Sequence, residues 1–200
     1  MLKKIGAAIV FSIVFAFNPF NPIVIGENSN SNYRSHLFEK SSKKLIDSSK
    51  ISIGGIKLGM KEKDIIKKLG KPKSRTIKYN DFCDLRLYTT IWKFDGLEIE
   101  GLSTTNNPSN SEVHQITTYS SYYSTEKGVK VGDNIIKALK AYSTLLSTYE
   151  YSSTLSTSEL LSKIDSENRL GYANDAYGGL FFSTNKQRNI REIRLVVGAC

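Results

Sequence analysis

The chain has 200 residues, of which 40% are hydrophobic and 24% charged, and it carries a formal net charge of +9. This length suits one domain or two small fused units. The two cysteines, Cys83 and Cys200, exclude a disulfide-rich framework, because they allow only one intrachain bridge.

The first residues have the layout of a secretory signal peptide. Lys3 and Lys4 form a charged start, and an apolar run of 13 residues follows over 5–17. We expect cleavage after Gly26, which makes 1–26 the signal peptide, and export to the periplasm or secretion across a bacterial envelope. An uncleaved anchor is the alternative, although the run is shorter than the ~18 residues expected of a membrane span. No cysteine lies near the cleavage site to carry a lipid.

Positive charge is concentrated in one part of the chain. Residues 34–78 hold 14 Lys/Arg against 4 acidic residues, whereas residues 79–200 hold 12 against 14. The basic part indicates peripheral contact with an anionic membrane surface or an acidic partner, and a solvated helix face is the alternative. Nucleic acid is not an expected partner, because an exported protein rarely meets it and no base-reading motif is present.

The first part of the mature chain predicts one helix and several strands. Residues 27–50, rich in Ser, Asn and Lys, suit a linker or leader, with a short helix near 36–48 as the alternative. A glycine turn over 53–60 leads into an amphipathic helix over 61–69, which Gly70 ends and Pro72 prevents from continuing. Alternating patterns and a tight Asp95-Gly96 turn predict strands over 74–78, 85–94, 97–102 and 113–119.

The pattern then restarts. The order Gly-Val-Lys-Val-Gly over 128–132 echoes Gly-Ile-Lys-Leu-Gly over 55–59, at a spacing of 73 positions (Lys57 to Lys130). Apolar spacing predicts a helix over 134–149, with Asp133 as its N-cap. A second helix over 158–164 is indicated by the capping-box pair Ser156 and Glu159. Strands follow over 169–174, 179–184 and 190–198.

These elements predict an α+β fold. We expect a tandem repeat of helix plus antiparallel strands, with the helices packed on one face of a sheet. The first repeat covers residues 51–124 and the second covers 125–200. Each half is smaller than most units that fold alone, so we expect the two halves to combine their strands in one sheet.

The segment from Gly55 to Pro72, with its Gly-Ile-Lys-Leu-Gly-Met start and Gly-Lys-Pro end, resembles the opening of the SmpA/OmlA domain, the BamE fold of a small outer-membrane lipoprotein. The duplicated form resembles the tandem repeats of β-lactamase-inhibitory-protein-like proteins, which are secreted and pair two such units. The resemblance covers residues 53–72 and 128–149, and elsewhere it extends only to strand order and turn placement.

The resemblance implies a fold more than a function, because such domains occur as envelope scaffolds, inhibitors and uncharacterised exported proteins. The chain lacks the acylated N-terminal cysteine of the lipoprotein form, which puts an outer-membrane assembly role in doubt. The matched positions are structural glycines, a proline and a core helix face, so no functional residue is carried over.

The sequence contains no recognisable catalytic set. His36 and His114 lack metal-ligand spacing and are expected at the surface, so we predict no metal site and no cofactor. Glu98 and Glu100 share one strand face, which suits the wet side of a strand better than acid–base catalysis. Neither a nucleophile-elbow pattern nor a phosphate-binding glycine loop is present. We therefore expect a protein that is not an enzyme.

Tyrosine is the most informative excess in the composition. Tyr119, Tyr122 and Tyr123 crowd at the end of one predicted strand, within Tyr-Ser-Ser-Tyr-Tyr-Ser. Tyr and Ser together suit a recognition surface, because Tyr supplies a large contact area for few frozen torsions. Ordinary β-propensity is the alternative explanation.

Two functional classes fit these sequence features. The first is an exported, non-catalytic protein-binding module of the inhibitor or immunity type, with the three tyrosines as partner-binding residues. The alternative is an envelope structural or assembly factor that contacts anionic lipid or outer-membrane proteins through residues 34–78. In an exported protein we also expect a disulfide between Cys83 and Cys200, with two unpaired thiols as the alternative.

Overall fold

The computed structural model describes residues 43–82, 85–150, 154–174 and 178–198. They belong to a compact unit over Lys40–Cys200 that contains both expected repeats. Its elements in chain order are η1 (Ser48–Lys50), α1 (Glu62–Leu69), β1 (Ser74–Phe82), β2 (Leu85–Phe94), β3 (Leu97–Ser103), η2 (Pro108–Asn110), β4 (Glu112–Thr118), α2 (Ile135–Ala141), α3 (Thr157–Glu167), β5 (Arg169–Ala173), β6 (Gly179–Thr184) and β7 (Ile190–Val196).

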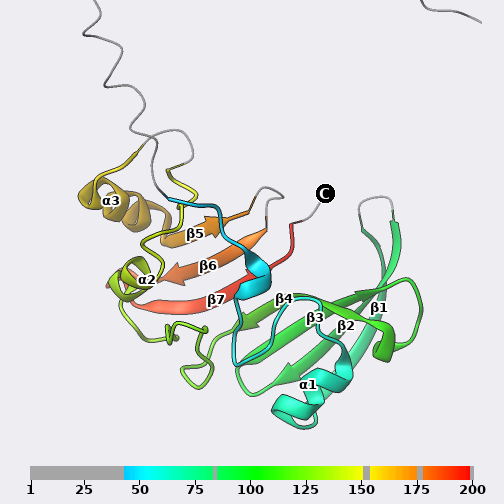
Figure 1. Cartoon of the computed structure of the whole chain (residues 1–200). Coiled ribbons are helices and arrows are strands. Elements are labelled where there is room, and N and C mark those ends of the chain that lie inside the picture. The colour runs from blue at the N-terminus through cyan, green and yellow to red at the C-terminus, as the bar shows by residue number, and fades with distance from the viewer. Residues whose placement is uncertain (1–42, 83–84, 151–153, 175–177, 199–200) are drawn as a thin grey trace, which may run out of the picture. The chain divides into compact units, whose positions relative to one another are not determined.

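The strands of the described residues form one antiparallel sheet of seven, in the order β1-β2-β3-β4-β7-β6-β5 (Figure 1). The strands of the first half lie on one side of the sheet and those of the second half on the other. The last strand of each half, β4 and β7, meet at the junction, where Ile116 is opposite Leu195 and Thr118 is opposite Ile193. The predicted α+β class, with helices packed against an antiparallel sheet, is confirmed.

One face of the sheet holds the core. Cross-strand registers place Trp92, Ile99 and Ile116 on this face, in line with Leu195 and Leu180, and all five side chains are fully enclosed. Helices α1, α2 and α3 add side chains to the same core: Ile65 from α1, Ala138 from α2, and Leu160 and Ile164 from α3. Strand side chains alternate between faces, so the intervening residues lie on the opposite face, which we call the open face.

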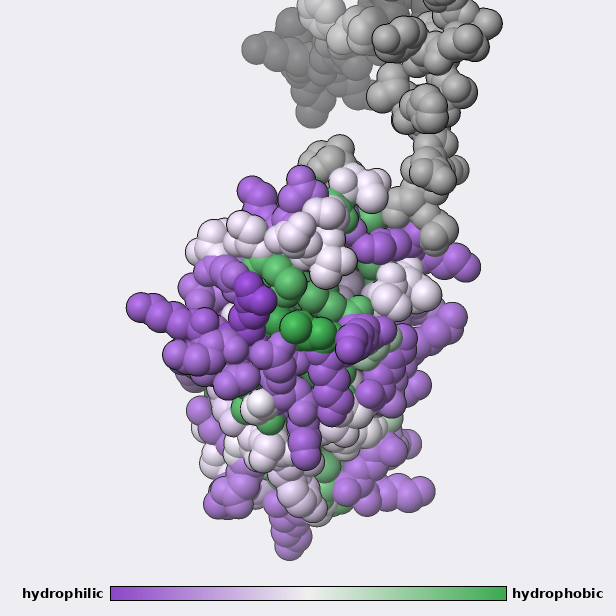
Figure 2. All heavy atoms as spheres, turned by 90° about the vertical axis from the view of Figure 1, so that its left-hand side faces the viewer, coloured by the Kyte–Doolittle hydropathy of each residue, from purple (hydrophilic) through white to green (hydrophobic). Residues whose placement is uncertain are grey.

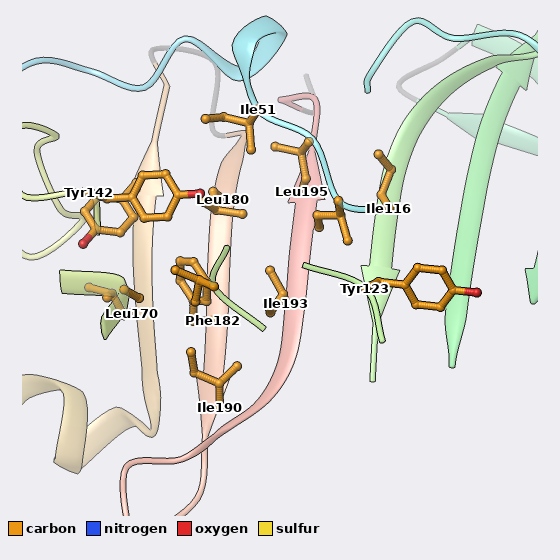
Figure 3. Close-up of a cluster of buried hydrophobic side chains, with 14 of the residues drawn as sticks. Ile51, Ile116, Tyr123, Tyr142, Leu170, Leu180, Phe182, Ile190, Ile193 and Leu195 are labelled. Atoms are coloured by element: carbon orange, nitrogen blue, oxygen red, sulfur yellow. The ribbon is translucent and has the colours of Figure 1, made fainter. Parts of the chain in front are cut away.

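The last residues of the expected linker over 27–50 are part of the fold. The backbone of Lys44 pairs with that of Leu145, and Ile46 and Ile51 are 4% and 6% exposed. Figure 3 shows Ile51 among the side chains of β6 and β7. In the described part of the predicted helix near 36–48, residues 43–47 are not helical and only Ser48 belongs to the short η1, because Ile46 reaches the core from an extended chain.

Helix α2 is much shorter than the predicted helix over 134–149. Serines and threonines follow Tyr142, and such side chains compete with helical hydrogen bonding. Here Leu146 donates its N–H to the carbonyl of Lys44, and Ser147 donates both its N–H and its hydroxyl to Glu150. The N-cap is Asn134 and not Asp133. By contrast, the predicted capping box of Ser156 and Glu159 is present at the start of α3.

The glycine-containing segments that precede α1 and α2, over 53–60 and 125–132, make matching backbone hydrogen bonds, and we call them the lead-ins. Gly59 donates to Val113 at the start of β4, and Gly132 donates to Ile190 at the start of β7, both at 2.8 Å. In return Val113 donates to the carbonyl of Met60, and Ile190 to that of Asp133. Gly59 and Gly132 have φ values of 78° and 92°, which glycine adopts without the strain of a side chain. The lead-ins also pair with each other through Ile53 and Thr125.

Candidate functional site

A line of charged and polar residues crosses the centre of the open face. Lys93, Glu98 and Thr117 are consecutive cross-strand partners on β2, β3 and β4. Lys93 Nζ lies 2.9 Å from Glu98 Oε2, and this hydrogen bond raises the pKa of Lys93. Thr117 is opposite Arg194 of β7, whose guanidinium lies over the Phe181 ring of β6, 5.7 Å from its centroid.

A second group on this face surrounds Glu100. Gln115 donates its side-chain N–H to Glu100 Oε1 at 3.0 Å, and His114 Nε2 lies 3.8 Å from Oε2. Burial and then the charge of Glu98 raise the pKa of Glu100, while burial lowers the pKa of His114. The expected surface position of His114 is wrong: its side chain is only 16% exposed. A bulge between Glu100 and Gly101 shifts the β3–β4 register there, so strict alternation does not predict its placement.

Tyr119 extends the open face at the end of β4. Its N–H donates to the carbonyl of Gly96, and its side chain is 58% exposed. Burial and then the charges of Glu192 and Glu98 raise the pKa of Tyr119. An exposed aromatic ring on such a face suits protein recognition.

The other two predicted tyrosines differ from each other. Tyr122 is 85% exposed, whereas Tyr123 is 8% exposed and packs edge-on against the Tyr122 ring, with centroids 5.1 Å apart. A Cβ at Gly54 would lie 2.7 Å from the Tyr123 ring, so the ring closely covers the first lead-in. Tyr119 and Tyr122 are therefore available to a partner, and Tyr123 is a core residue.

The structure places some of the residues that the sequence offers for metal binding or acid–base chemistry. No three of their His, Cys, Asp or Glu side chains come together as metal ligands. The Glu98 and Glu100 carboxylates are held by Lys93 and Gln115. Three further predicted residues, His36, Cys83 and Cys200, lie outside the described residues, so the disulfide stays a prediction.

Helix α1 forms a second candidate surface. Exposed lysines of α1 and its flanks make no ion pair within the described part of the chain; they are Lys57, Lys63, Lys67, Lys68 and Lys71. Lys61 differs from them, since it lies 3.6 Å from Glu112. Within the described ranges, none of the helices has the length and apolar character needed to cross a bilayer.

Sequence reasoning did not find Gln115, Phe181, Glu192 or Arg194 as members of the open face. Alternation on each strand shows which residues share a side, but the β4–β7 pairing that brings the two halves together has no local signal. Comparison of the chain with family models, curated proteins and solved structures gives no match.

Proposed function

We propose that this protein is an exported, non-catalytic protein-binding module of the inhibitor or immunity type. The observation that carries the proposal is the open face of the seven-stranded sheet, with the exposed Tyr119 directly after β4 and the exposed Tyr122 three residues further along the chain. Such a face can contact a protein over a broad area without a deep pocket.

The chemistry of the open face supports protein recognition over the binding of a highly charged ligand. At its centre Lys93 is paired with Glu98, and the Arg194 guanidinium lies over the Phe181 ring. Paired charges favour specificity and correct orientation at an interface, whereas aromatic anchors contribute most of the affinity.

We also propose that the two halves are tandem repeats. The hydrogen bonds of Gly59 to Val113 and of Gly132 to Ile190 support this, as do bridges of Lys61 to Glu112 and of Asn134 to Asn189. Adding 77 to a residue number in β4 gives the corresponding residue in β7, so Ile116 corresponds to Ile193 and Thr118 to Leu195. The pair Ile116–Leu195 therefore corresponds to the pair Ile193–Thr118, and the β4–β7 pairing stays the same when the two halves are exchanged. This self-consistency is expected when two copies of one unit pair through the same strand.

The partner-binding proposal can be tested by capture from the envelope and medium of the host with immobilised protein of residues 27–200. A double variant, Tyr119→Ala with Tyr122→Ala, should weaken binding of the captured partner at least ~30-fold, since a hot-spot tyrosine contributes about 2 kcal/mol. Tyr79→Ala is the matched control, because Tyr79 is 51% exposed on the edge strand β1. Equal binding by the double variant and wild type would exclude these tyrosines.

The second candidate function is that of an envelope structural or assembly factor. The unpaired lysines around α1 favour it, because positive charge attracts an anionic lipid surface. Binding to vesicles containing anionic lipid should then fall on changing Lys63 and Lys67 to Gln, and should disappear in high salt. Tight vesicle binding that survives high salt would contradict this electrostatic mechanism.

A further inference from the structure

The side of the molecule that carries α2 and α3 contains a cavity away from the open face. Its volume is about 240 Å³, and its walls come from α2, the segment that follows it, α3 and β5. Figure 2 shows a hydrophobic patch framed by hydrophilic residues on this side. Half-buried leucines of these elements pack against the core from there, namely Leu139, Leu145, Leu155 and Leu161.

Two aromatic rings form the inner wall of the cavity. Tyr142 and Tyr172 have centroids 5.4 Å apart, and Tyr172 packs edge-on against Phe182 of β6. Leu139, Leu145 and Leu160 complete the apolar lining. An engineered apolar cavity of about 150 Å³ is enough to bind benzene, so this one can hold a substituted aromatic ring.

The polar end of the cavity has no uncompensated charge. Lys43 Nζ lies 2.6 Å from Glu150 Oε1, and Ser147 donates to Glu150 Oε2 through both its N–H and its hydroxyl. Burial alone would raise the pKa of Glu150, but hydrogen bonds from Lys43 and Ser147 outweigh it and lower that pKa. The carboxylate is thus ionised and neutralised by Lys43, and a charged ligand would have no counter-ion here.

Among the buried polar groups of the lining, the Tyr172 hydroxyl remains for a ligand. Tyr172 is only 2% exposed, and its hydroxyl makes no hydrogen bond within the described part of the chain. In the described part of the chain, every fully enclosed side-chain oxygen or nitrogen has a hydrogen-bond partner. The Tyr172 hydroxyl has none, so it is not fully enclosed and must open into the cavity that Tyr172 lines. By contrast, the Tyr142 hydroxyl donates to Glu126 Oε1 at 3.0 Å.

We infer that the cavity between α2 and α3 binds a small neutral molecule with an apolar body and one hydroxyl or amide group, which hydrogen-bonds to Tyr172. The leucines and tyrosine rings enclose the body of this molecule. This binding site is independent of the proposed recognition face, because the cavity lies among α2, α3 and β5 on the core side of the sheet.

Benzyl alcohol and toluene are matched probes for this site, since they differ only in the hydroxyl. Titration of the purified mature protein, followed by NMR chemical shifts, should show saturable binding of both compounds, with benzyl alcohol the tighter. Tyr172→Phe should weaken benzyl alcohol about fivefold, the typical effect of one hydrogen bond, and leave toluene within about twofold. Benzylamine and benzoate should bind at least tenfold more weakly than benzyl alcohol.

Two further variants locate the binding. Leu139→Trp should fill the cavity and abolish binding of both probes, with retained folding checked by its thermal transition. Leu102→Trp is the control, because Leu102 lines a separate cavity of about 380 Å³ beside β2 and β3. Absence of saturable binding, tighter binding of benzylamine, equal loss of both probes in Tyr172→Phe, or loss only in Leu102→Trp would overturn the inference.

Discussion

The three tyrosines of the Tyr-Ser-Ser-Tyr-Tyr segment should differ strongly in how much their removal lowers the free energy of unfolding. Tyr123 is 8% exposed and its ring covers Gly54, whereas Tyr119 and Tyr122 are 58% and 85% exposed. Removing a buried aromatic side chain costs about 3–5 kcal/mol, through lost burial and the cavity left behind. Surface substitutions usually change stability by less than about 0.5 kcal/mol.

Urea unfolding of the purified mature protein measures this difference directly. With a urea slope of about 2 kcal/mol/M, Tyr123→Ala should lower the unfolding midpoint by about 1.5–2.5 M. Tyr119→Ala and Tyr122→Ala should each shift it by less than about 0.3 M. Tyr123→Phe is the control, since it keeps the ring in place. The reasoning fails if Tyr123→Ala unfolds with the wild-type midpoint, or if Tyr122→Ala is equally destabilising.

Three other predictions follow from buried or bridging groups. Glu62 accepts hydrogen bonds from Arg75 and from the enclosed Trp92 indole. In urea unfolding, Glu62→Ala should therefore lower the free energy of unfolding by about 2–3 kcal/mol, and Glu62→Gln should lower it clearly less. Equal losses of stability in the two variants would contradict this. Burial lowers the pKa of His114, so the folded state resists its protonation. Stability should therefore fall as pH drops below about 6.5, and more in wild type than in His114→Gln; parallel pH profiles would refute it. Denatured, unreduced protein should show no free thiol if Cys83 and Cys200 are bridged, and two reactive thiols would exclude the bridge.

The positions of most elements could be predicted because their signals are local. The Asp95-Gly96 turn separates β2 from β3 as expected, and Gly70 ends α1. Alternation placed all seven strands, although β1 runs on to Phe82, beyond the predicted end at residue 78, because it pairs with β2 along its full length.

The errors arise where tertiary contacts override a local pattern. The apolar spacing of residues 142–149 fits a helix, yet the chain there pairs with the extended segment around Lys44, which carries Ile46 into the core. Tyrosine composition indicated a recognition surface but not which rings would be buried. That depends on the approach of the Gly54 lead-in, which lies far from Tyr123 in the sequence.

The proposed repeat helps to separate features of the fold from features of function. Positions that match in both halves, such as Gly59 with Gly132, are explained by the lead-in hydrogen bonds to β4 and β7 and need no functional role. The halves differ elsewhere. Glu62, which accepts hydrogen bonds from Arg75 and Trp92, corresponds at a spacing of 73 positions to the apolar Ile135 of the second half. Three features occur in one half or at the junction alone: the lysines Lys63, Lys68 and Lys71 of α1 and its flank, the α2–α3 cavity, and Tyr119 with Tyr122. Because the common fold does not require them, they are the features that binding experiments should address first.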